Sequence, residues 1–194
     1  MLLRRRGALR GQRGRGMRWT ISHRADDIAR PLADRHYNRQ KIGAKGFVPP
    51  GRCLVLTAGS PPRALWVTSW PFAEYVRHAW AGAWVCSCFR NEGAGLSSEL
   101  IYEAEQATRA YWGDPPPLGF ITFVDAKKTE KKDKPGWCYR KAGWKHAGFT
   151  KGGLWALSHA PEAIPDARPA HAKGTLGASL ANLEVSLERL ARAL

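Results

Sequence analysis

The sequence predicts an α/β (α+β) fold built on one mixed, mostly antiparallel central sheet flanked by helices. Three observations support this prediction. A strand, a glycine loop, a helix and a second strand follow one another over residues 83–124, one hairpin precedes this unit, and another follows it. Hydrophobic residues make up 44% of the 194 residues, which is enough for one domain with a core of its own.

The expected elements begin with a strand over residues 17–22, where apolar and polar side chains alternate. A short helix is predicted from about residue 24 until Pro31 disturbs it. Residues 52–57 and 64–70 are β-favouring runs separated by Gly, Ser and Pro, so we expect them to pair as an antiparallel hairpin.

The central unit has the most regular pattern in the chain. Residues 83–89 are an apolar run, and a glycine loop separates them from residues 97–112, where apolar side chains recur at helical spacing. Ser97 is expected to cap this helix and Gly113 to end it, before a buried strand over residues 119–124. A glycine loop that opens a helix presents free backbone N–H groups at the positive end of the helix dipole, so this unit predicts an anion-binding site.

The last part of the chain is predicted to add a short helix, a second hairpin and a terminal helix. Residues 136–144 fit the short helix, and residues 145–150 and 153–158 fit the hairpin. Residues 159–173 are rich in Pro and Ala and are expected to be a linker, and a leucine stripe in residues 174–194 predicts an amphipathic C-terminal helix. This helix either packs on its own domain or pairs two chains as a homodimer.

Positive charge dominates the composition. The chain has 31 Lys and Arg against 16 Asp and Glu, for a net charge of +15. Residues 1–16 contain six arginines and no acid and are expected to be a disordered basic arm, with Met17 as an alternative start. A second basic cluster spans residues 127–145. Two separate clusters favour a polyanionic partner such as nucleic acid over a merely solvated surface.

Composition also excludes several classes of protein. No run of about 18 apolar residues is present, so no membrane span is expected, and the arginine-rich start does not fit a secretory signal. We therefore predict a cytoplasmic protein. Its four cysteines lack the paired spacing of a zinc site and are expected to be buried thiols, with Cys86 and Cys88 on one face of a strand.

Candidate catalytic residues occur at three places. His36 and Tyr37 follow the first helix, Asp125 follows the buried strand at its carboxyl end, and Tyr139 lies in the short helix. Three of them have an ordinary alternative role: His36 as a surface histidine, Asp125 as a turn-forming residue and Tyr139 as a packing residue.

The chain resembles the GNAT acyltransferase family in the order of these elements and in two motifs. The motifs are Arg90-x-x-Gly93-x-Gly95 after the fourth strand and Tyr139-x-x-x-Gly143-Trp144 before the final hairpin. The resemblance covers residues 17–158, the expected catalytic domain. In that family the glycine turn holds the pyrophosphate of coenzyme A by its N–H groups, so the resemblance implies acetyl-CoA or a related acyl-CoA as cofactor. The cofactor-binding residues that it implies are Arg90, Asn91, Gly93, Ala94, Gly95, Ser97 and Ser98.

Four further segments resemble one branch of that family, the bacteriophage Mom proteins, which alter adenine bases in DNA. They are His36-Tyr37, Arg90-Asn91-Glu92-Gly93, Phe123-Val124-Asp125 and Cys138-Tyr139-x-x-Ala142-Gly143-Trp144. The resemblance implies a phage-type transferase that modifies the exocyclic amine of adenine in double-stranded DNA. It would act in the host cell cytoplasm if a phage or prophage encodes it.

Such chemistry makes demands that the candidate residues can meet. The exocyclic amine is a weak nucleophile because its lone pair is delocalised into the ring, so the enzyme must flip the base, position it and assist proton removal. Tyr37 or Trp80 could stack on the flipped base. Asp125 is the candidate general base, and Tyr139, by resemblance, the candidate proton or hydrogen-bond donor. Alternatively, His36 and Asp125 are two ligands of an iron centre of the kind that the resemblance implies, whose third ligand the sequence does not name.

The residues expected to contact DNA phosphates are Arg35, Arg39, Lys127, Lys128, Lys131, Lys132 and Lys134. Two other functions stay open: a GNAT N-acetyltransferase that acts on a small-molecule or protein amine, and a nucleic-acid-binding module that has lost its chemistry. One feature opposes a donor site, since Glu92 in the glycine turn and Glu99 in the first helical turn would repel a phosphate. The site survives only if both carboxylates point away.

Overall fold

The computed structural model describes residues 16–71, 79–129 and 134–173. Predictions that fall on residues 1–15, on the C-terminal helix, on Lys131 and Lys132, and on the aromatic residues of 72–78 lie outside the described residues. The described chain forms an α+β fold around one seven-stranded mixed sheet, which confirms the predicted mixed class. In this part of the chain, no helix is long and apolar enough to cross a membrane.

The predicted hairpins, the central helix and the strand after it are present within two residues of the expected bounds. The strands are β1 (Trp19–Ser22), β2 (Arg52–Ala58), β3 (Ala64–Trp70), β4 (Trp84–Asn91), β5 (Phe120–Val124), β6 (Lys145–Phe149) and β7 (Trp155–His159). The helices are α1 (Arg30–Asp34), α2 (Ser97–Trp112) and α3 (Trp137–Lys141), with a 3-10 turn, η2, at Pro161–Ala163.

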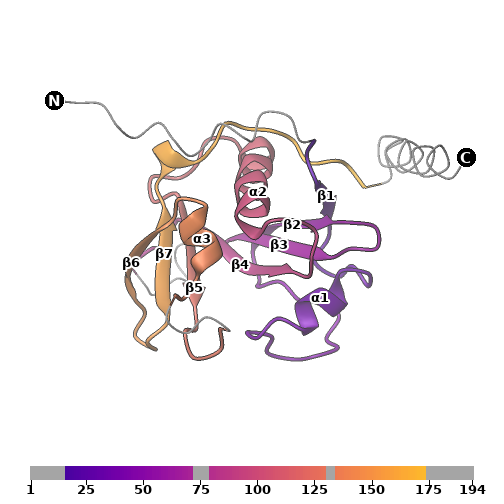
Figure 1. Ribbon diagram of the computed structural model, residues 1–194, viewed down its shortest axis with the longest axis horizontal. Helices are drawn as coiled ribbons and strands as arrows, with labels where there is room; N and C mark the ends of the chain where they lie inside the picture. The colour runs from indigo at the N-terminus through magenta and orange to yellow at the C-terminus, as the bar shows by residue number, and fades with distance from the viewer. Residues whose placement is uncertain (1–15, 72–78, 130–133, 174–194) are drawn as a thin grey trace, which may run out of the picture.

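The sheet has the strand order β1-β2-β3-β4-β5-β7-β6. All neighbours are antiparallel except β4 and β5, which are parallel and therefore need the crossover that α2 provides. These two strands pair only from Trp84 with Phe120 to Cys86 with Thr122, so they separate beyond that point. Figure 1 shows the result: β2, β3 and β4 lie together on one side of the molecule, and β5, β7 and β6 on the other.

Apolar side chains cover both faces of the sheet. On one face, α2 packs on a core that includes the fully buried Trp19, Trp66 and Trp84. On the other face, Leu32 of α1 and Phe47 pack on a second cluster from β2, β3 and β4. On this face α1 therefore covers the β2–β4 half of the sheet.

A buried polar cluster ties α2 to the second half of the sheet. Oε1 of Glu105 accepts a hydrogen bond from Nε1 of Trp144 at 2.6 Å and lies 2.8 Å from Nδ1 of His159 in β7. Burial raises the pKa of the Glu105 carboxyl, and its Oε2 has no partner among the described residues. This cluster joins α2, β7 and Trp144, three residues after the end of α3.

A bulge in β4 decides which side chains face the site. Along β3, Val67 pairs with Cys88 and Thr68 with Cys86, so Ser87 is the extra residue. The bulge directs Cys86 into the core under α2 and Cys88 into the core under α1. The expectation that both thiols share one face is therefore wrong, although both are buried and free as predicted.

Two local predictions at helix starts are wrong. α1 begins at Arg30 rather than near residue 24, because Pro31 is tolerated in the first turn, where its missing N–H would have no helical partner. Leu96, not Ser97, is the cap residue of α2, and Ser97 is its first helical residue. The Ser97 hydroxyl accepts a hydrogen bond from the Asn91 side chain instead of capping the helix.

The segment expected to be a linker, residues 159–173, packs along the domain. The N–H of Arg168 donates to the carbonyl of Gln106 in α2 at 3.2 Å. Further on, His171 forms an isolated parallel bridge with Thr20 of β1, at the edge of the sheet. The Pro and Ala content of residues 159–173 suits an extended segment that makes few hydrogen bonds to the rest of the domain.

Candidate functional site

A cavity of about 510 Å³, here called the central cavity, lies where β4 and β5 separate. Its walls come from the turn after α1, the ends of β4 and β5, the first turn of α2, and α3. The lining residues are His36, Tyr37, Phe89, Leu96, Ser97, Ser98, Val124, Thr129, Lys134, Gly136, Trp137, Cys138, Tyr139 and Lys141. The fold thus joins the start of α2 to three of the four catalytic candidates.

Those three candidates are His36, Tyr37 and Tyr139. The rings of His36 and Tyr37 are stacked, with centroids 4.5 Å apart and planes at 26°. The Tyr139 hydroxyl lies 3.3 Å from Sγ of Cys86 in β4. Tyr139 is buried against Trp66, Phe89 and Trp144 and also forms part of the cavity wall.

Burial sets the protonation of these groups. Burial, and the nearby charge of Arg90, lower the pKa of His36 to about 4, so its imidazole is neutral at pH 7. Nδ1 of His36 accepts the backbone N–H of Asn38 at 3.3 Å, which places the ring proton on Nε2. Burial raises the pKa of Tyr37 to about 12 and that of Tyr139 well above its usual value. The site therefore holds an imidazole N–H donor and two protonated phenols.

Asp125 lies beside this group but is turned toward its own loop. Its backbone hydrogen-bonds to Tyr37. One carboxylate oxygen accepts the N–H of Lys127 at 3.0 Å, and the other lies 4.0 Å from Nζ of Lys128. This is the turn-forming arrangement that a strand-ending Asp commonly adopts, so Asp125 must leave that bond to act on a ligand in the cavity.

The iron hypothesis finds no complete set of ligands here. A facial iron site uses two His and one carboxylate. Within the described residues, no three His, Cys, Asp or Glu side chains converge as metal ligands. His36 and Asp125 alone do not complete such a centre.

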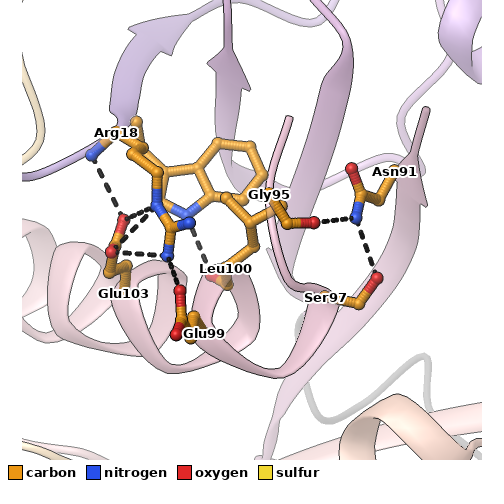
Figure 2. A network of polar contacts seen from close by, with 8 residues as sticks. Arg18, Asn91, Gly95, Ser97, Glu99, Leu100 and Glu103 are labelled. Carbon is orange, nitrogen blue, oxygen red and sulfur yellow. Dashed lines mark hydrogen bonds and ion pairs between the residues drawn. The ribbon is translucent and has the colours of Figure 1, made fainter. Parts of the chain in front are cut away.

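The glycine turn, residues 90–95, is closed by a side chain of its own. Oδ1 of Asn91 accepts the N–H groups of Gly93 at 3.1 Å and Ala94 at 2.9 Å. Its Nδ2 donates to the carbonyl of Gly95 at 2.8 Å and to Oγ of Ser97 at 2.9 Å, as Figure 2 shows. The expectation that this turn leaves its own N–H groups free therefore does not hold for Gly93 and Ala94.

The backbone N–H groups that could bind an anion lie just after the glycine turn, at the start of α2. The N–H groups of Ser97 and Ser98, in the first turn of α2, make no hydrogen bond within the described residues. Both residues line the central cavity. A helix of 16 residues adds its positive dipole end to these two donors, so the start of α2 favours an anion in the cavity.

Both carboxylates that opposed a donor site are neutralised. Glu92 accepts a bidentate pair from Arg35 at 2.8 and 2.7 Å and a further bond from Arg90 at 2.6 Å. The Arg35 and Arg90 bonds lower the pKa of Glu92 to about 2. Glu99 pairs with Arg18 at 3.2 Å, and the same guanidinium holds Glu103 in α2 (Figure 2). Their negative charges are directed into ion pairs.

Arg63 and Arg18, which the sequence analysis did not select, lie close to Gly93 and Gly95 of the turn. A Cβ at Gly93 would lie 2.7 Å from Nη2 of Arg63, and one at Gly95 would overlap Nη1 of Arg18. Both glycines have positive φ, at 92° and 146°. The glycines are thus required by backbone conformation, whereas the guanidinium groups end flexible side chains that could move aside.

Trp137 is a cavity residue that the motifs did not predict. It is 38% exposed, and the ammonium groups of Lys134 and Lys141 lie 5.3 and 4.7 Å from its ring. An indole beside two cations offers stacking and positive charge at one place. Its only signal in the sequence is its position two residues before Tyr139.

The predicted DNA-contact residues divide into two groups. Arg39 is held inside the protein by Asp34 and by the carbonyls of Gly46 and Ala44, and Arg35 is paired with Glu92. In contrast, Lys127, Lys128 and Lys134 are exposed. The lysines after β5 are the better phosphate contacts, because their charges are less committed to the fold.

A second cavity of about 490 Å³ lies on the other side of His36. Its wall includes Ser87 and Cys88 of the bulge and the side chains of Asn38, Phe47 and Val48. His36 lines both cavities, so two ligands could approach it from different sides.

Comparison of the sequence with models of known protein families finds no match, and comparison with curated proteins finds none either.

Proposed function

We propose that this protein is a GNAT-like, phage-type DNA-modification transferase that modifies the exocyclic amine of adenine with an acyl-CoA-like donor. The observation that carries the proposal is the central cavity, where the first N–H groups of α2, which have no partner in the described part of the chain, lie with His36, Tyr37 and Tyr139. The order of the elements along the chain is the one on which the GNAT resemblance rests. Together they support a site for an anionic donor beside polar catalytic groups.

The donor would be held mainly by backbone groups. A pyrophosphate at Ser97 and Ser98 would accept their N–H groups at the helix start, with Arg18 and Arg90 neutralising the nearby carboxylates. Trp137, with Lys134 and Lys141, is suited to the nucleotide part of the donor. A donor bound there would supply a thioester carbonyl carbon that an amine can attack.

The residues around His36 then have separate roles in acyl transfer. Nε2–H of His36 donates a hydrogen bond to the oxygen that gains negative charge when the amine attacks. Asp125, one residue after the cavity residue Val124, takes the proton that the amine loses. Tyr139, a protonated phenol, gives its proton to the sulfur as the carbon–sulfur bond breaks. Water restores both protonation states afterwards.

DNA would approach from the end of the molecule that is lowest in Figure 1. The turn after α1, the start of the loop after β5 and the β6–β7 turn all lie at this end. The exposed Lys127 and Lys128 begin the loop after β5. A flipped adenine from this side would meet the stacked rings of His36 and Tyr37.

Mass spectrometry of nucleosides tests the proposal. DNA from cells that express the protein should contain a new adenine adduct, and DNA from cells with Tyr139→Phe or Asp125→Ala should lack it. Tyr111→Phe is the matched control, because Tyr111 is 54% exposed at the far end of α2 and should leave the adduct unchanged. Unmodified DNA with acetyl transfer to a small amine would overturn the proposal in favour of an N-acetyltransferase. Neither product would indicate a nucleic-acid-binding module.

A further inference from the structure

An exposed aromatic cluster, here called the hairpin tip, is formed by His146, Phe149 and Trp155 of the β6–β7 hairpin. Their ring centroids are 4.9 Å apart for His146 and Phe149, 4.7 Å for His146 and Trp155, and 5.4 Å for Phe149 and Trp155. Phe149 is nevertheless 58% exposed. Each ring holds the others in place while the outermost one stays in water, so the cluster is preorganised without being buried.

The pairing of the strands places this tip next to the central cavity. Phe149 pairs with Trp155 across the hairpin, and Trp155 pairs with Val124 of β5. Val124 lines the central cavity. The tip is therefore one strand away from the cavity wall, and Trp155 packs against the core on the face that carries α2 and α3.

The positive charge around the hairpin tip favours a negatively charged partner. From Lys134 to Pro161 the chain contains five Lys and Arg and no Asp or Glu, and Lys145 and Lys151 on the hairpin are both exposed. A second copy of a chain with net charge +15 would be repelled here. Nucleic acid offers phosphates to the lysines and base faces to the rings, so it matches both features of this surface.

We propose that the hairpin tip contacts the base stack of duplex DNA beside the adenine that enters the cavity, with Phe149 stacking on or inserting between the bases. This proposal rests on the proposed function, because it takes duplex DNA as the substrate. Flipping a base removes its stacking interactions, and an apolar ring inserted nearby replaces part of them. Phe149, held from behind by His146 and Trp155, is arranged to be that ring.

Binding and fluorescence measurements on Phe149→Ala test the proposal. Removal of a base-stacking ring should lower duplex affinity about tenfold at fixed salt. It should also reduce the fluorescence rise of 2-aminopurine, an adenine analogue that brightens when unstacked, placed at the target adenine of the duplex. Tyr111 of α2 is similarly exposed, so Tyr111→Ala should change neither quantity, and Phe149→Trp should restore both. If Phe149→Ala melts at a lower temperature, Phe149→Leu replaces it, since Leu keeps apolar bulk without a ring.

Two results would overturn the proposal. One is equal affinity and equal fluorescence for Phe149→Ala and Tyr111→Ala. The other is a change of oligomeric state by sedimentation in Phe149→Ala with DNA binding unaltered, which would make the tip a contact between copies. Neither measurement depends on catalysis, so a chain that leaves DNA unmodified but needs Phe149 to bind it would refute the proposed function alone.

Discussion

The glycine turn and the β6–β7 hairpin lie on two sides of the central cavity and differ in how their cations are paired. Those around the turn bind carboxylates, whereas the hairpin has no carboxylate of its own. Around the turn, Arg35 and Arg90 bind Glu92, and Arg18 binds Glu99. On the other side, the stretch from residue 134 to residue 161 has cations and no carboxylate. The comparison teaches that a net charge of +15 identifies a partner only where cations are not already used by the fold.

Replacing Arg18 tests the paired side and should give the largest effect on folding. Arg18→Met removes the guanidinium that pairs with Glu99 and with the buried Glu103. Removing one partner of such an ion pair should lower the free energy of unfolding by about 2–4 kcal/mol. Urea denaturation measures it. Lys145→Met, an exposed cation on the hairpin, is the matched control and should change stability by less than about 0.5 kcal/mol. Equal destabilisation of both variants would break the comparison.

Replacing the exposed lysines beside the central cavity should change DNA binding rather than stability. Changing Lys127, Lys128 and Lys134 together to Gln should weaken duplex binding by about ten- to a hundredfold. It should also reduce the slope of log K against log salt by about 0.9 for each DNA phosphate that the variant no longer neutralises. Titrations at several salt concentrations measure both. An unchanged slope would show that these charges do not lie on phosphate.

A smaller effect is expected from pH. The folded pKa of Glu92 is lowered to about 2 by Arg35 and Arg90, below the ordinary value of 4.5, so the unfolded chain takes up its proton first. The stability that Glu92 contributes is present above pH 4.5 and is lost as pH falls toward 2. Glu92→Gln should remove this part of the acid sensitivity, as measured by urea midpoints from about pH 6 to about pH 3. Identical pH dependence in both proteins would contradict the ion-pair account.

The sequence predicted regular structure well and local polar detail poorly. The bounds of α2 and of both hairpins followed from periodicity and turn residues, which are properties of neighbouring positions. The bulge at Ser87 did not, because one extra residue in β4 is defined only by its pairing with β3. It reversed the predicted relation of Cys86 and Cys88.

The site shows the same difference between features set by neighbouring residues and features set by contacts between distant residues. His36, Tyr37 and Tyr139 line one cavity because the fold brings their segments together. The role of Asn91 was not foreseen, since an Asn side chain that binds its own turn looks in sequence like any polar residue. The partners of Glu92 and Glu99 were also hidden, because Arg35 and Arg18 are far away along the chain.

Residue-resolved hydrogen exchange, with and without acetyl-CoA, tests the central claim most directly. If the start of α2 binds the donor, the amides of Ser97 and Ser98 should exchange more slowly in the complex. The amides of Gly93 and Ala94, already bonded to Asn91, should change little. Unchanged exchange at Ser97 and Ser98 under saturating acetyl-CoA, or protection confined to Gly93 and Ala94, would contradict the account.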